Sequence, residues 1–220
     1  EWIIGKFNMD LKNKSSLAIV NWAFRVCLFL AGTSVTVIGE ENVPKDVPVL
    51  YIGNHRSYFD ILITYIRVPR PTGYIAKKEM LRYPLLSNWM KNLHCLFLDR
   101  KDIKQGLKTI LTAIEKVKSG ISICIFPEGT RNRVNDTFME FHEGSFKIAE
   151  KTGCPIIPMS INNSAQIFED HIPKIKKAHV VLEYGKPIYP AELSKEERKH
   201  LGVYTQNIIK ETYFKNKELV

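Results

Sequence analysis

The sequence predicts an α/β fold in which a mostly parallel or mixed central sheet of about seven strands is flanked by helices. Short apolar runs that resemble buried strands alternate along the chain with longer segments of helical periodicity. Polar residues follow several of these runs directly, as His55, Arg100 and Glu128 do. In sheets covered by helices, ligands bind beyond the carboxyl ends of the strands. The pattern therefore places these three residues at one edge of the sheet.

The expected elements follow one another in a regular order. Strands are expected at 35–39, 48–54, 72–76, 94–98, 121–126, 155–161 and 178–184. Helices are expected at 58–67, 80–92, 102–118, 144–152 and 195–214. The last helix begins with Ser194 and Glu197, which form a capping box. With 220 residues, we expect one ordinary α/β domain at 35–220, preceded by a helical segment at 1–34.

Residues 15–31 of that first segment have the pattern of a strongly apolar helix. The run is short for a transmembrane helix, and Arg25 interrupts it. An amphipathic helix that lies in the membrane interface, with Arg25 among the lipid headgroups, fits the pattern better. Its apolar surface would come from Trp22, Phe24, Leu28 and Phe29. The alternative is a core helix that packs on the sheet.

The chain carries a net charge of +9, and its positive charge is concentrated in one region. Residues 67–118 contain 12 Lys and Arg but four Asp and Glu. Such a region attracts anionic membranes, phosphate-bearing substrates or nucleic acid, although part of it is the polar face of helix 102–118. We find no nucleic-acid recognition motif and expect no such partner. The four cysteines and six histidines lack metal-ligand spacing, so no metal site is expected.

His55 and Asp60 form the first motif that suggests chemistry. A neutral imidazole can take a proton from an alcohol near neutral pH, and a carboxylate on its other nitrogen fixes the tautomer. On a continuous helix the two side chains would lie about 140° apart. Pairing therefore requires His55 in a loop and Asp60 in the first turn of the next helix, with Ser57 as its cap. The alternative is that Asp60 only completes a cap beside a loop histidine.

A second motif, Phe126-Pro127-Glu128-Gly129-Thr130-Arg131, follows another expected strand. Pro127 and Gly129 indicate a turn at the strand end. The turn would display Glu128, Thr130 and Arg131 together, and the planar guanidinium of Arg131 suits a phosphate group. The alternative is an ordinary strand exit with solvated charges.

Asn54-His55 with Asp60, followed by the 126–131 motif, resembles the 1-acyl-sn-glycerol-3-phosphate acyltransferases of phospholipid biosynthesis. Three further segments match in order and spacing: Ala76-Lys77-Lys78-Glu79-Met80, Leu96-Phe97-Leu98-Asp99-Arg100 and Cys154-Pro155-Ile156-Ile157-Pro158. The resemblance spans roughly residues 35–190. The segment Phe141-His142-Glu143-Gly144 departs from the family, which more often has lysines there.

The resemblance implies transfer of a fatty acyl group from acyl-CoA or acyl carrier protein to the free hydroxyl of lysophosphatidic acid, with no further cofactor. His55 would act as the base and Asp60 would orient it. The glycerol phosphate would be bound by a larger set: Lys77, Arg100, Glu128, Gly129, Thr130 and Arg131. The lipid substrate implies association with an anionic membrane, and we expect this at its cytoplasmic face.

Two other functions are compatible with the sequence. Acyl transfer to glycerol 3-phosphate or to another lysophospholipid would use the same chemistry. A non-catalytic, basic protein that binds membrane surfaces would also fit the charge, but the intact His55 and Asp60 argue against it.

Overall fold

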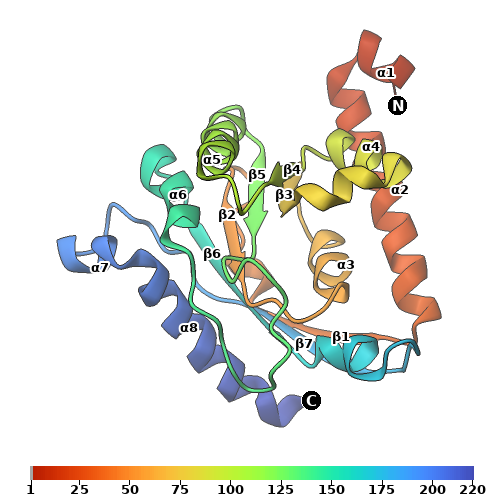
Figure 1. Ribbon diagram of the computed structural model, residues 1–220, viewed down its shortest axis with the longest axis vertical. Helices are drawn as coiled ribbons and strands as arrows, with labels where there is room; N and C mark the ends of the chain where they lie inside the picture. Colours follow the sequence, from red (N-terminus) through yellow and green to blue (C-terminus); the bar gives the residue numbers. More distant parts are fainter. Residues whose placement is uncertain (1) are drawn as a thin grey trace.

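A seven-stranded mixed sheet forms the centre of the computed structural model, which describes residues 2–220 (Figure 1). The strands are β1 (Ser34–Ile38), β2 (Leu50–Gly53), β3 (Thr72–Lys77), β4 (Leu96–Leu98), β5 (Ser122–Ile125), β6 (Ile156–Asn162) and β7 (His179–Tyr184). Their order across the sheet is β1-β7-β6-β2-β5-β3-β4. All neighbours are parallel except β6 and β7. The predicted fold class is confirmed.

Helices cover both faces of this sheet and form two core layers with it. One layer contains α2 (Met9–Leu30), α3 (Phe59–Tyr65) and α4 (Pro84–Asn92). The other contains α5 (Ile103–Lys118), α6 (Lys147–Thr152) and α8 (Leu201–Lys215) (Figure 1). Along β2, Leu50 and Ile52 face the second layer, whereas Tyr51 faces the first. This alternation follows from the two-residue period of a strand, and burial on both faces explains the continuous apolar run.

Shorter helical segments complete the fold. They are α1 (Trp2–Phe7), α7 (Lys195–Lys199) and the 3₁₀ segments η1 (Glu40–Asn42), η2 (Lys78–Arg82), η3 (Glu143–Phe146), η4 (Ser164–Ile167), η5 (Glu169–His171) and η6 (Asn216–Leu219). Glu1, the first residue of the predicted N-terminal segment, lies outside the described residues. The proposed boundary between segments 1–34 and 35–220 stays a prediction.

Several element ends differ from the expected ones for local reasons. The helix expected at 80–92 is divided into η2 and α4, because Pro84 takes the first position of α4, where its missing N–H costs nothing. The helix expected at 195–214 is interrupted at His200. Strand β4 begins at Leu96 rather than at residue 94, and His94 has a left-handed backbone conformation with φ of 60°.

The long N-terminal helix α2 has apolar side chains on two faces. It begins at Met9, earlier than expected, where the Asn8 side chain accepts a hydrogen bond from the Leu11 N–H. Leu28 is buried, and Phe24 packs edge-on against Tyr65 with ring centroids 5.8 Å apart. Trp22 and Phe29 are 68% and 81% exposed. The core alternative is therefore right for one face of α2, and our assignment of Phe24 and Leu28 to the membrane-facing surface was wrong.

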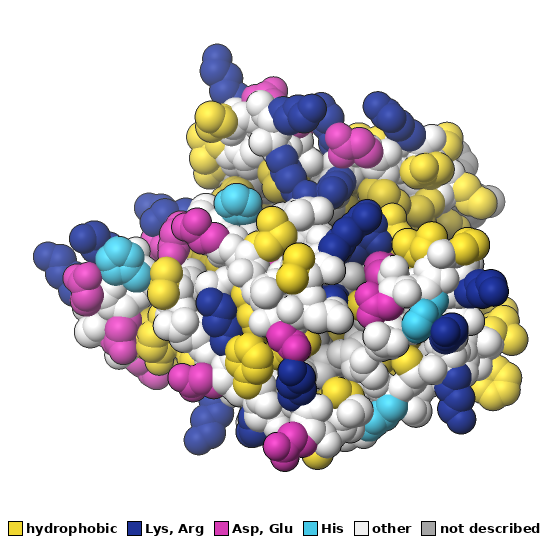
Figure 2. Space-filling view, turned by 60° about the horizontal axis from the view of Figure 1, so that its bottom comes forward, with side chains coloured by type: hydrophobic (Ala, Val, Ile, Leu, Met, Phe, Trp, Pro, Cys, Tyr) yellow, Lys and Arg dark blue, Asp and Glu magenta, His cyan; other side chains and the backbone are white. Residues whose placement is uncertain are grey.

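Arg25 contacts the end of α3, and its place among the lipid headgroups stays a prediction. Its Nη2 donates to the carbonyl oxygen of Ile66 at 3.4 Å. Ile66 follows the last turn of α3, where a positive charge is favourable. In residues 2–220 we find no helix that combines the length and the apolar character of a membrane span. Figure 2 shows hydrophobic side chains gathered at the right, the side on which α2 runs in Figure 1.

Candidate active site

The loop between β2 and α3 carries the predicted catalytic pair. His55 lies in this loop and Asp60 in the first turn of α3, as their pairing requires. His55 Nδ1 lies 2.8 Å from Asp60 Oδ2. The imidazole also stacks on the Phe126 ring, with centroids 4.4 Å apart and planes inclined by 16°. Two contacts thus fix the ring, and the carboxylate selects the tautomer with its hydrogen on Nδ1.

The Asp60 carboxylate is completely buried and organises its own loop. Oδ2 accepts the backbone N–H groups of Arg56 and Ser57, each at 2.8 Å, in addition to His55 Nδ1. A buried carboxylate oxygen needs hydrogen-bond donors that replace the water it has lost. Ser57 does not cap α3 in the expected way, because the cap position is Tyr58. The hydroxyl oxygen of Ser57 instead accepts the Phe59 N–H at 3.0 Å. Asp60 therefore closes the turn before α3 and also holds the His55 imidazole, so the alternative that it only completes a cap is wrong.

Two further contacts bind this loop to β6 and to the loop that follows β5. The Asn54 side chain pairs with Ile161 of β6, donating to its carbonyl oxygen and accepting its N–H, both at 2.9 Å. The carbonyl oxygen of His55 accepts the N–H of Asn132, which follows the second motif, at 2.7 Å. Asn54 is thus a structural member of the first motif, and the two motifs are bonded to each other.

Glu128 makes a second connection between the motifs. Its Oε1 accepts the His55 N–H at 2.9 Å, and its Oε2 accepts the Met139 N–H at 3.1 Å. Burial raises the pKa of this carboxyl, while the two N–H donors act to lower it. Both oxygens are therefore engaged in ordering the loops. The predicted contact of Glu128 with substrate stays a prediction.

Gly129 is placed in a tight turn where glycine is required. Its φ of 71° lies in the left-handed region. A Cβ there would lie 3.3 Å from the His142 ring and 3.6 Å from Arg100 Nε. The structure thus brings His142, from the segment that departs from the family pattern, beside a predicted substrate-binding arginine. Thr130 is half-buried in the same loop.

Positive charges gather near this turn. Partial loss of solvent lowers the pKa of Lys77, and the charges of Arg100 and Arg131 lower it further, whereas Glu79 raises it. Partial loss of solvent likewise lowers the pKa of Arg100. Lys77 ends β3, Arg100 follows β4 and Arg131 follows β5, so three strand ends bring the cations together. Mutual repulsion of this kind is relieved by binding an anion.

Arg131 has two protein partners that the sequence did not indicate. Its Nη1 donates to Glu169 Oε1 at 2.7 Å. Its guanidinium carbon lies 3.6 Å from the centroid of the Tyr58 ring. The arginine is therefore held in place while 21% of its side chain stays exposed.

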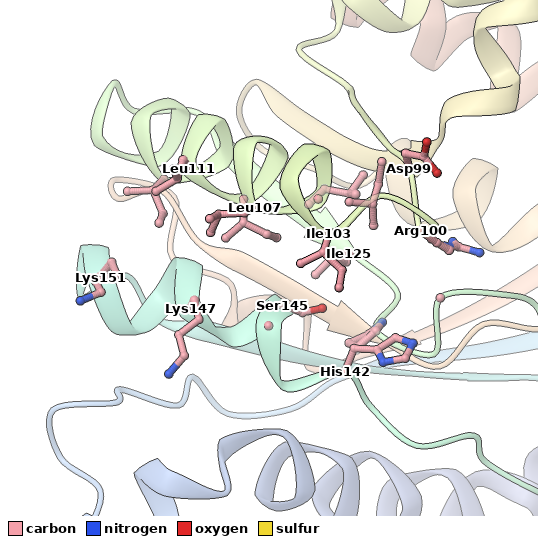
Figure 3. A pocket seen from close by; sticks show the side chains of 18 of the residues that line it. Asp99, Arg100, Ile103, Leu107, Leu111, Ile125, His142, Ser145, Lys147 and Lys151 are labelled. Carbon is pink, nitrogen blue, oxygen red and sulfur yellow. The ribbon is translucent and has the colours of Figure 1, made fainter.

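An apolar groove of about 1020 Å³ begins beside this cluster. Arg100, Gly129 and His142 line it together with Phe126, on which His55 stacks. Its length follows α5, where Ile103, Leu107 and Leu111 face it, and α6 lies opposite (Figure 3). These three leucine and isoleucine side chains are at least half exposed although they are apolar. Such a surface is suited to an apolar ligand.

All predicted site residues therefore come from one edge of the sheet. The structure adds Phe126, Tyr58 and Glu169 as residues that hold His55 or Arg131. Phe126 belongs to the second motif, but nothing in the sequence indicated its contact with His55. Glu169 belongs to a segment with no motif, and nothing in the sequence indicated it. Within residues 2–220, no three His, Cys, Asp or Glu side chains are placed to hold a metal ion.

Comparison with known proteins identifies the family. A model of the acyltransferase family matches residues 34–162, more than half of the chain. The chain belongs to the acyltransferase family. The matched range contains His55, Asp60 and the cationic residues, so the family predicted from the motifs is confirmed.

Curated acyltransferases resemble most of the chain. It is 33% identical over 196 residues to the 1-acyl-sn-glycerol-3-phosphate acyltransferase of Borreliella burgdorferi, an alignment that covers 89% of this chain and 78% of that protein. The acyltransferase of the same name from Saccharomyces cerevisiae is 28% identical over 187 residues, covering 84% of this chain and 60% of that protein.

A solved acyltransferase has the same fold. The crystal structure of the 1-acyl-sn-glycerophosphate (LPA) acyltransferase PlsC from Thermotoga maritima superimposes with a TM-score of 0.79 at 27% identity. The superposition covers 92% of this chain and 81% of that one. The similarity thus extends beyond the motifs to the whole arrangement of sheet and helices.

The role of Glu128 can be tested by removing its carboxylate. Glu128→Ala leaves the N–H groups of His55 and Met139 without their carboxylate acceptor, and an unsatisfied N–H costs about 1–3 kcal/mol where water cannot reach it. We expect a lower free energy of unfolding in urea and a loss of activity. Glu140→Ala, which alters an exposed glutamate of the same loop, is the control. Equal stability of the two variants would contradict the ordering role.

Proposed function

We propose that this acyltransferase transfers a fatty acyl group from an acyl thioester to the free hydroxyl of a 1-acylglycerol 3-phosphate, forming phosphatidic acid. The observation that carries the proposal is the His55–Asp60 pair next to the mouth of an apolar groove and beside a cluster of cations. The names of the similar proteins support the same reaction.

The geometry of the pair assigns the proton transfers. Because Nδ1 donates to Asp60, Nε2 has the free lone pair that accepts the hydroxyl proton. The alcohol oxygen then attacks the thioester carbonyl carbon, and the carbonyl electrons move to oxygen. When the tetrahedral intermediate collapses, the carbon–sulfur bond breaks and the thiolate takes the proton from His55. Asp60 stabilises the imidazolium between these steps. No acyl-enzyme is needed.

Two neighbouring surfaces would hold the substrates. The apolar groove takes the acyl chain of the donor, because burying a hydrocarbon chain removes apolar surface of both partners from water. Lys77, Arg100 and Arg131 take the phosphate of the acceptor, with Arg131 supplying the bidentate fork. The turn at Gly129 and Thr130 lies between them. Both acyl-CoA and acyl carrier protein fit this scheme, and parallel assays with the two donors distinguish them.

Membrane association completes the proposal, since the acceptor is a lipid. The exposed face of α2, defined by Ile19, Trp22, Val26 and Phe29, offers apolar surface to a bilayer. The basic residues between 67 and 118 add attraction to anionic headgroups. All four cysteines are free, which fits a reducing compartment and hence the cytoplasmic face.

Replacing the catalytic pair tests the reaction itself. His55→Ala should abolish acceptor-dependent thiol release, because it removes the base. Asp60→Asn can keep its oxygen on the three N–H donors but loses the charge, so turnover should fall on the order of 10²–10⁴-fold. His200→Ala, an exposed histidine on another surface, should keep full activity. Near-normal turnover of His55→Ala would refute the mechanism.

Replacing Arg131 tests the phosphate site. Arg131→Ala should raise the KM for lysophosphatidic acid, because losing a charged partner of phosphate costs roughly 1.5–3 kcal/mol. The effect should shrink for a monoacylglycerol, which lacks the phosphate. Arg133→Ala, an exposed arginine nearby, serves as the control. Equal losses with both acceptors would exclude the phosphate role.

Point substitutions on α2 test membrane binding. Deleting residues 1–32 would also remove Val20 and Leu28 from the core, so Trp22→Glu combined with Phe29→Glu is the better variant. It should stay folded by circular dichroism and bind anionic vesicles less well in flotation. Binding of the wild type should weaken with salt, because each basic residue near the surface contributes about 1 kcal/mol. Val203→Glu, on the exposed surface of α8, is the control. Unchanged flotation of the double variant would contradict membrane binding through α2.

A further inference from the structure

The segment between β6 and β7 contains a residue that reaches the proposed phosphate site. Glu169, the first residue of η5, accepts two hydrogen bonds on Oε1. One comes from Arg131 Nη1 at 2.7 Å and the other from the Tyr58 N–H at 2.8 Å. Its side chain is 11% exposed. One carboxylate oxygen thus joins η5, the start of α3 and the loop after β5.

The same contacts restrict Arg131 on two sides. The Tyr58 ring covers one face of the guanidinium at 3.6 Å from its centroid, and Glu169 binds one edge. A free arginine side chain loses rotamer entropy when a ligand immobilises it. An arginine that is already held loses less, and the remaining donors of its planar fork keep a fixed direction.

We propose that Glu169 is a positioning residue that sets Arg131 for the phosphate of the acceptor. Selection of a phosphorylated acceptor then depends on a residue outside both motifs. The inference rests on the proposed function and extends it. The competing explanation is a purely structural ion pair that fastens η5 to α3.

Three substitutions of Glu169 separate the effect of the accepting oxygen's position from the effect of its negative charge. Glu169→Ala removes the acceptor for both N–H groups, so Arg131 is released. Glu169→Asp keeps the charge but withdraws the oxygen by one methylene group. Glu169→Gln keeps an oxygen that can accept from Arg131 and Tyr58. We expect the Ala and Asp variants to raise the KM for lysophosphatidic acid on the order of tenfold, with a much smaller change in kcat. The Gln variant should restore a KM near that of the wild type.

Asp170→Ala, which alters the next and exposed residue of η5, should leave both constants unchanged. The Ala and Asp variants are both compared by their KM for lysophosphatidic acid, so the test does not depend on the folding of any one variant. A lower melting temperature with an unchanged KM would show a purely structural role and overturn the proposal.

A double-variant cycle tests whether Glu169 acts through Arg131. In an Arg131→Ala background, Glu169→Ala should raise the KM no further, because the residue that it positions is gone. Equal increases in both backgrounds would overturn the inference. Failure of the proposed function has a different signature: the wild type would release no thiol in response to lysophosphatidic acid. The inference fails alone when the wild type is active and Glu169→Ala leaves the KM unchanged.

Discussion

The buried carboxylate of Asp60 is the interaction on which the site depends. A charge without solvent must be matched by donors, and here a single oxygen accepts three N–H groups from three consecutive residues, His55 to Ser57. Bringing these donors together bends the chain into the turn that begins α3. The same contacts orient the imidazole. The stability of the turn and the orientation of the imidazole are therefore consequences of one electrostatic requirement.

A second buried carboxylate, that of Glu128, extends this order to the neighbouring loop. It bonds the N–H of His55 on one side and that of Met139 on the other. Asn54 and Asn132 add contacts between the same loops and β6. These bonds hold the loops that carry the His55 imidazole, the cations and one end of the groove in defined relative positions, as the proposed catalysis by positioning requires.

The three cations near the Gly129 turn are not held in the same way. Lys77 and Arg100 are exposed and lie where strand ends converge, so their repulsion can be relieved by a bound anion. Arg131 is instead held by Tyr58 and Glu169. The cluster thus combines two exposed cations with one arginine whose guanidinium group has a fixed direction. This arrangement suits the proposed binding of a phosphate group in a defined orientation.

The sequence by itself determined the α/β class and the approximate positions of all seven strands, and it indicated that His55 can pair with Asp60. These follow from local rules: the period of apolar residues, the turn residues and the angle between side chains on a helix. It could not determine that Phe24 and Leu28 pack inward while Phe29 faces out, because α2 is apolar on both faces. Nor could it find Glu169, whose role exists only because the chain after β6 folds back over α3. Contacts between distant segments depend on how the layers pack, and only the tertiary structure decides them.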